Sequence, residues 1–232
     1  MDRIWINFEH TANQLSVSEK VVCVGNPLRS AFGACDRAEA RSRLGIPQNT
    51  FFVLSFGGSG GAEEINSAAI ELMRHFGSRV GYRHLHAAGK RDYENTRARF
   101  ESYGLEKSEN CILKDYIYDM PLQMAAADLV ISRAGAMTIS ELARMGKAAI
   151  LVPSPHVTDN HQFVNAKTLE DANAALLVEE KTLAEGGLTE AMEKLLNGGT
   201  AIRELEKNVL AFADRDANRL IWQEITELVK GK

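Results

Sequence analysis

The sequence predicts an α/β fold, with an open, mostly parallel Rossmann-like sheet and helices on both faces. Short apolar runs that are typical of strands alternate with helical patterns along the 232 residues. The segment 51–54 is apolar throughout, as in a strand covered on both faces. The next segment repeats apolar residues with helical spacing, at Ile65, Ala68, Ala69, Leu72, Met73 and Phe76. Sheets of this kind bind ligands over the carboxyl ends of their strands.

Composition narrows the choice of partners. The formal net charge is −4 and no basic stripe occurs, which argues against nucleic acid or an anionic lipid surface as the main partner. The three cysteines, Cys23, Cys35 and Cys111, are scattered and form no CxxC, so we expect reduced thiols rather than disulfides or a zinc site. No run reaches the length of a membrane span, and the first residues do not open a signal peptide. The predicted location is cytoplasmic.

The amino-terminal segment is expected to be part of a larger structure. Residues 4–6 form a short apolar run, a polar connector follows, and Val21–Val24 begins a second strand. A lone strand cannot bury its faces, so residues 1–20 are expected to be the edge of something larger, with the chain beginning mid-protein. Gly25 to Arg29 ends the second strand in a turn. Arg29 at a strand end could reach a diphosphate, although a surface ion pair is the commoner use of such a residue.

A glycine-rich loop joins the strand at 51–54 to the helix after it. Its residues are Gly57, Gly58, Ser59, Gly60 and Gly61. Strand, glycine loop and helix can cradle a phosphate, because glycines let the backbone approach the ligand. The loop is not a Walker motif, since no Lys-Ser/Thr follows, and the dinucleotide fingerprint places Glu63 at its third glycine. A plain tight turn remains the alternative.

Two further strand regions carry polar or aromatic side chains. His84 and His86 alternate on the predicted strand 82–88 and share a face, which permits metal binding but fits ordinary packing better. After the strand at 111–113 come Tyr116, Ile117 and Met120, which could sandwich a flat base or simply belong to the core.

The stretch from Asp128 to Gln162 carries the strongest functional pattern. A strand at 129–132 leads through the small-residue turn 133–136 into a helix expected from about Thr138. Uncovered N–H groups at such a helix start hold anions, and Glu141, one turn later, suits a pair of sugar hydroxyls. Phosphate beside ribose indicates a nucleotide.

The remaining segments complete the sheet. A strand is predicted at 148–152 and a last one at 174–178, with a polar loop between them that ends at Asn160, His161 and Gln162. These three suit sugar hydroxyls, although Asn160 could merely cap the helix and His161 could act as a base. The final helix shows an apolar stripe that needs a partner.

Five motifs in order carry a family resemblance: GNPLR (25–29), FGGSGGAEEIN (56–66), YIYDM (116–120), ADLVISRAGAMTISELARMGKAAILVPSP (127–155) and DNHQFVNA (159–166). Together they resemble the carboxyl-terminal, donor-binding half of the MurG family, two-domain GT-B enzymes that transfer GlcNAc from UDP-GlcNAc to a lipid-linked acceptor. The resemblance implies that residues 21–232 form the donor domain. Residues 1–20 would then be a strand and connector from a missing amino-terminal acceptor domain.

The resemblance also implies a role for each matching residue. Main-chain groups of Ile117 would read the uracil, with Tyr116 and Met120 beside it. Glu141 would bind the ribose. The diphosphate contacts would be Arg29, Ser59 and the N–H groups of Met137 and Thr138. The region meeting GlcNAc would comprise Arg133, Ala136, His161 and Gln162. The rest of the donor site would be Gly57, Gly58, Gly60, Gly61, Ile139 and Ser140. His161 and Gly60 stand where other family members carry Gln.

The implied chemistry is inverting GlcNAc transfer onto lipid I to make lipid II, without cofactor or bound metal. No DxD-like pair occurs in the glycine loops, so helix N-termini, Ser59 and Arg29 would meet the charge on departing UDP. The general base would belong to the missing half. We therefore expect the chain alone to bind UDP-GlcNAc but transfer nothing, and the complete enzyme to lie at the cytoplasmic face of the plasma membrane.

Two other functions stay open from sequence. One is a naturally split donor subunit that joins a membrane-bound acceptor half. The other is a UDP-sugar sensor or 2-epimerase relative, which would need catalytic carboxylates and a His from both domains, whereas this chain offers only Glu141 firmly.

Overall fold

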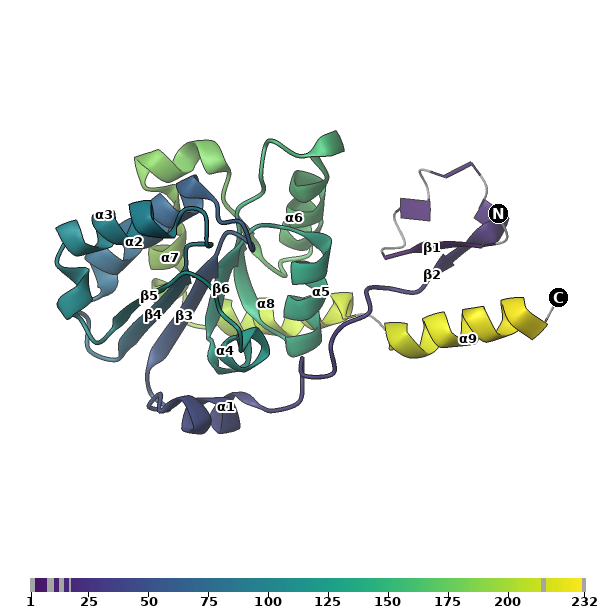
Figure 1. The fold of residues 1–232 in the computed structure, drawn as a ribbon, viewed down its shortest axis with the longest axis horizontal. Helices are drawn as coiled ribbons and strands as arrows, with labels where there is room; N and C mark the ends of the chain where they lie inside the picture. Colours follow the sequence, from purple (N-terminus) through teal and green to yellow (C-terminus); the bar gives the residue numbers. More distant parts are fainter. Residues whose placement is uncertain (1–2, 8–10, 13–14, 17, 214–215, 231–232) are drawn as a thin grey trace.

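A six-stranded parallel sheet forms the centre of the structure (Figure 1). The computed structural model describes residues 3–7, 11–12, 15–16, 18–213 and 216–230. The strands are β3 (Phe51–Phe56), β4 (Tyr82–Ala87), β5 (Cys111–Lys114), β6 (Leu129–Ser132), β7 (Ala148–Leu151) and β8 (Leu176–Leu177), in the order β5-β4-β3-β6-β7-β8. Every neighbouring pair in this sheet is parallel. The predicted fold class is confirmed.

Helices cover both faces of this sheet. The α-helices are α1 (Arg37–Leu44), α2 (Glu63–Phe76), α3 (Tyr93–Ser102), α4 (Met120–Ala126), α5 (Ala136–Met145), α6 (His161–Asp171), α7 (Gly187–Asn197), α8 (Ala201–Val209) and α9 (Ala217–Lys230). Residues of α1, α4, α5 and α6 share one core cluster, those of α2 and α7 share a second, and those of α2 and α3 share a third. The apolar stripe predicted for α2 is fully buried, which confirms that helix.

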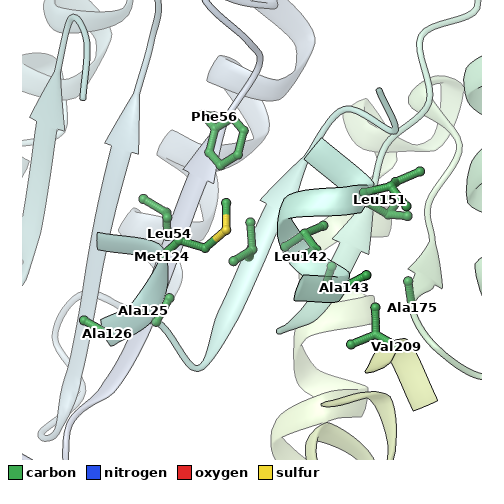
Figure 2. Packing of buried hydrophobic residues seen from close by; sticks show 14 of the residues in the cluster. Leu54, Phe56, Met124, Ala125, Ala126, Leu142, Ala143, Leu151, Ala175 and Val209 are labelled. Atoms are coloured by element: carbon green, nitrogen blue, oxygen red, sulfur yellow. The ribbon is translucent and has the colours of Figure 1, made fainter. Parts of the chain in front are cut away.

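The first core cluster contains both small and large side chains (Figure 2). Met124 of α4 points toward Leu54 and Phe56 of β3, while Leu142 of α5 lies on the same layer beside β7. Met124 and Leu142 are fully buried. Burying each such side chain stabilises the fold by about 1.5–3 kcal/mol, so this layer fixes α5 on the sheet.

The strand order reverses between β3 and β6. The chain moves outward in one direction from β3 to β4 and β5, and in the other from β6 to β7 and β8. Phe56 pairs with Ser132 in register, so both strands end at the same level. The loops after them, residues 57–61 and 133–135, therefore begin side by side at the topological switch point, where open α/β sheets bind ligands.

The strand at 21–23 does not belong to this sheet. β2 (Val21–Cys23) pairs in parallel with β1 (Ile4–Ile6) in a separate two-stranded sheet, and α9 runs beside that pair (Figure 1). Arg3 forms an ion pair with Glu224 of α9 at 3.2 Å. Arg29 therefore follows a strand of the small sheet and not of the main one, because strand pairing is a long-range choice that the local apolar run does not encode. The proposed boundary after residue 20 stays a prediction.

Candidate functional site

The amino-terminal end of α5 presents free amides at the switch point. Gly135 is its N-cap with extended backbone (φ −70°, ψ 143°), and the helix begins at Ala136, two residues before the predicted start. Ile139 N donates to Gly135 O at 3.0 Å, so the N–H groups of Ala136, Met137 and Thr138 lie before the first intrahelical bond. Its first turn carries no acidic residue. This helix end can therefore hold an anion.

The start of α2 is electrostatically different. Glu63 and Glu64 occupy its first turn, so carboxylates already complement the helix dipole there. Within the preceding loop, Gly58 has φ +100° and a Cβ atom would meet nothing within 4 Å. Ser59 and Gly60 are exposed. The exposed middle of the loop is thus free to face a ligand, while α5 offers the stronger positive end.

Packing explains the two outer glycines of this loop. A Cβ atom on Gly57 would lie 2.6 Å from the Cβ of Ala62. One on Gly61 would lie 2.2 Å from the carbonyl oxygen of Ala88. These two positions require glycine for structural reasons, so the tight-turn interpretation holds for them. The cradle interpretation of the exposed middle of the loop stays a prediction.

Glu141 lies one turn into α5 and is half-buried. Burial raises the pKa of its carboxyl to about 7, and the positive charge of Arg29 opposes that rise. Arg29 itself is exposed and its guanidinium lies 5.4 Å from the ring centre of Phe32. The structure thus brings the predicted arginine into electrostatic reach of the predicted acid, although it follows no strand of the main sheet.

An exposed aromatic pair follows β5. The rings of Tyr116 and Tyr118 are 4.9 Å apart in an edge-to-face arrangement. Lys90, from the loop after β4, lies 5.6 Å from the Tyr116 ring centre and 5.8 Å from that of Tyr118. Ile117 is buried and Met120 packs partly on the same core cluster. Of the two earlier interpretations, the core one therefore holds for Ile117, whose side chain faces inward, while Tyr116 is on the surface.

The loop before α6 is held by its own polar groups. Asn160 has left-handed backbone (φ 50°), and its side chain makes no capping bond within the described chain. Gln162 Oε1 accepts from Ser154 N at 3.0 Å, and His161 Nδ1 donates to Thr158 O at 2.8 Å. Asn165 Nδ2 donates to Ala134 O at 3.1 Å, which ties α6 to the turn after β6. This bond places α6 close to the turn that precedes α5, and the contact of His161 and Gln162 with a sugar stays a prediction.

Three predicted site residues turn their side chains elsewhere. Arg133 forms an ion pair with Glu180 and donates to Val152 O at 3.3 Å. Ile139 is fully buried in the core. Ser140 accepts a hydrogen bond from Asn26 at 2.9 Å. Ligand contacts by these residues remain predictions, and for Ile139 no side-chain contact is available.

The two strand histidines form a buried network rather than a metal site. Ser55 Oγ lies 2.7 Å from both His84 Nε2 and His86 Nδ1. His86 Nε2 faces Asn66 Oδ1 at 3.0 Å, and Asn66 Nδ2 donates to Ala88 O at 3.0 Å. The last bond fixes the amide orientation, so His86 donates from Nε2 and accepts from Ser55. Burial lowers the pKa of both imidazoles. Across the described residues, no group of three His, Cys, Asp or Glu could hold a metal ion.

Sequence reasoning missed the residues that hold these loops in place. Asn66 falls inside the apolar stripe of α2 and is 2% exposed. Asn26 is 6% exposed and bonds to α5. A polar residue at a position that the periodicity marks as buried is the signal that could have found Asn66. Lys90 gave no signal, because its contact with Tyr116 depends on how two neighbouring strands pair.

The doubly wound parallel sheet, with two loop-to-helix turns at its switch point, defines one half of a GT-B type fold. The family described as glycosyltransferase family 28 C-terminal domain matches residues 52–221, and the chain belongs to this family.

Named relatives agree with this assignment. The chain is 39% identical over its full length to an Acetivibrio thermocellus UDP-N-acetylglucosamine–N-acetylmuramyl-(pentapeptide) pyrophosphoryl-undecaprenol N-acetylglucosamine transferase, of which it covers 62%. The crystal structure of Acinetobacter baumannii MurG superposes with a TM-score of 0.65 at 25% identity, over 92% of this chain and 58% of that one. A Neisseria meningitidis UDP-GlcNAc 2-epimerase bound to UDP-GlcNAc gives 0.67 at 15% identity, over 97% and 61%, which shows the fold alone. The chain thus spans about three fifths of the length of these relatives.

No helix within the described ranges has the length and apolar character needed to cross a membrane.

Proposed function

We propose that this chain is the donor-binding half of an inverting, metal-independent glycosyltransferase that takes GlcNAc from UDP-GlcNAc. The observation that carries this is the α5 start, where free amides of Ala136, Met137 and Thr138 stand one turn from Glu141. Amides suit the diphosphate and the carboxylate suits the ribose hydroxyls. The Acetivibrio relative is named as an N-acetylglucosamine transferase with a pyrophosphoryl-undecaprenol-linked acceptor, which supports the same sugar and favours transfer over epimerisation.

The proposed uracil site lies beyond the ribose, over the end of β5. Backbone groups of Ile117 would read the base edge, and the exposed ring of Tyr116 would lie beside it. Polar groups of His161 and Gln162, at the start of α6, would face the sugar. In this arrangement the base and the sugar would lie on opposite sides of the α5 start.

In the proposed reaction an acceptor hydroxyl oxygen bonds to the anomeric carbon of GlcNAc as the bond to the β-phosphate breaks. The UDP departs with that electron pair, and the hydroxyl proton passes to a base. The α5 amides, Ser59 and Arg29 would stabilise the charge that develops on UDP. The base and the binding site for a pyrophosphoryl-undecaprenol-linked acceptor would belong to an amino-terminal domain or partner subunit. That part would hold the complete enzyme at the cytoplasmic face of the membrane.

Calorimetric titration with UDP-GlcNAc, UDP-GalNAc, UDP-glucose and ADP-glucose tests the proposal. We expect UDP-GlcNAc to bind most tightly and ADP-glucose not to bind. Equal affinity for all four would contradict a uridine-specific donor site, and tighter binding of UDP-glucose would contradict the choice of sugar.

A further inference from the structure

A buried asparagine ties the segment that carries Arg29 to the first turns of α5. Asn26 Nδ2 donates to the carbonyl oxygen of Ala136 at 3.2 Å and to Ser140 Oγ at 2.9 Å. Asn26 is 6% exposed and Ser140 1% exposed, so the bond between them lies away from water, while the bond to Ala136 is partly buried. A hydrogen bond shielded in this way is costly to break, because its partners cannot be resolvated without moving the segment.

The chain between Asn26 and Arg29 transmits this constraint. Pro27 fixes its own φ and restricts the residue before it to extended conformations. Only Leu28 then separates this rigid pair from Arg29. The position of Arg29 therefore depends on where the Asn26 side chain is anchored.

Both ends of the tie belong to the candidate site. Ala136 is the first residue of α5, and its amide opens the proposed anion site. Ser140 directly precedes Glu141, and the positive charge of Arg29 lowers the pKa of the Glu141 carboxyl. We propose that Asn26 is a positioning residue, which holds Arg29 over the α5 start so that guanidinium, amides and carboxylate act on one ligand. The identity of this ligand rests on the proposed function, whereas the hydrogen bonds of Asn26 are independent of it.

A second contact on the same segment supplies a matched control. Asn218 Nδ2, at the start of α9, donates to the carbonyl oxygen of Leu28 at 3.2 Å. This bond also joins an asparagine amide to the segment, but it leads to α9 and not to the site. Asn218→Ala therefore removes a similar bond while leaving the Asn26 tie in place.

The carboxyl titration of Glu141, followed by ¹³C NMR in the unliganded chain, reads out the position of Arg29 directly. Arg29 is the charged group that acts on Glu141, and it lowers the pKa of this carboxyl. With Asn26→Ala the pKa should rise further, and the Kd for UDP-GlcNAc should increase about tenfold. Ser140→Ala keeps the bond to Ala136 and should give a smaller change of the same sign. Asn218→Ala should leave both the pKa of Glu141 and the Kd for UDP-GlcNAc close to the parent's values, as expected for a surface substitution away from the site.

The outcomes separate the inference from the proposed function. A folded Asn26→Ala variant with the parent's Glu141 titration and the parent's Kd would overturn the positioning role. Should Asn26→Ala fail to fold, an unchanged titration in Ser140→Ala would overturn it instead. If the parent binds no UDP-GlcNAc, the proposed function fails, while the titration still decides whether Asn26 positions Arg29.

Discussion

The backbone of Gly61 fills the space beside Gly89, so that a Cβ atom on Gly89 would lie 2.2 Å from Gly61 N. Both residues have positive φ, +86° and +83°. The loop after β3 and the loop after β4 therefore pack backbone to backbone at the edge of the candidate site. Such contact leaves no room for any side chain at either position.

This contact predicts a large difference between two glycine substitutions. Gly89→Ala should lower the free energy of unfolding by about 2–4 kcal/mol, because the new methyl group meets backbone that cannot yield. Gly60→Ala should change it by less than about 0.5 kcal/mol, since a Cβ there meets nothing within 4 Å. Urea unfolding measures both. Equal stability of the two variants would show that the loops do not pack this way.

The titration of Glu141 predicts a pH-dependent affinity for UDP-GlcNAc. The pKa of Glu141 is raised to about 7, and the ionised carboxylate is the form that accepts bonds from two ribose hydroxyls. Affinity should therefore fall as pH decreases through 7 and level off about tenfold or more below its value at pH 8, where the protonated carboxyl binds about as weakly as an uncharged variant. UDP-GlcNAc is the suitable probe, because its esterified diphosphate does not titrate in this range.

Glu141→Gln provides the control for that profile. The amide keeps one oxygen acceptor but has no ionisation, so its affinity should be lower than that of the parent at pH 8 and nearly constant down to pH 6. A profile in the Gln variant as steep as the parent's would assign the pH dependence to another group.

The buried histidines predict a loss of stability in mild acid. In the folded chain the pKa of His86 is lowered to about 4, and that of His84 is lowered well below its usual 6.5. Above pH 6.5 both are neutral in folded and unfolded states and no proton difference exists. Below pH 6.5 the two histidines are protonated in the unfolded chain but stay neutral in the folded chain. Each histidine should then lower the free energy of unfolding by up to about 1.4 kcal/mol per pH unit between 6.5 and about 4.

Urea midpoints at pH 7.5 and 5 check this prediction, with His86→Gln as the comparison. The variant should be less stable at pH 7.5 but should lose less between the two pH values. A parent whose stability does not change over this range would contradict the buried, neutral state of the network.

Catalysis by the chain alone is expected to be absent. The acceptor hydroxyl needs a base, and the two candidates near the α5 start have other proposed roles: Glu141 is assigned to the ribose and His161 to the donor sugar. Incubation of the purified chain with UDP-GlcNAc and a lipid-linked acceptor should release no UDP above the rate without acceptor. Measurable GlcNAc transfer would place a base, and an acceptor site, within this chain.

Local patterns were enough to predict the parallel sheet and most of its elements. The apolar run at 51–54 and the period of α2 report burial directly, and both are confirmed. The small residues after β6 marked the α5 start to within two residues; the error arose because Gly135 already serves as N-cap. Contacts between distant segments were beyond such patterns. Neither the pairing of β2 with β1 nor the bond from Asn26 to Ser140, 114 residues apart, leaves a local trace.

The central claim is that the α5 start and Glu141 bind the diphosphate and ribose of UDP, and calorimetry of the Glu141→Ala variant with UDP tests it most directly. At pH 8, where the parent carboxylate is ionised, the variant should bind UDP at least about tenfold more weakly, because two ribose hydroxyls lose a charged acceptor. An unchanged affinity in a variant that remains folded would contradict the account.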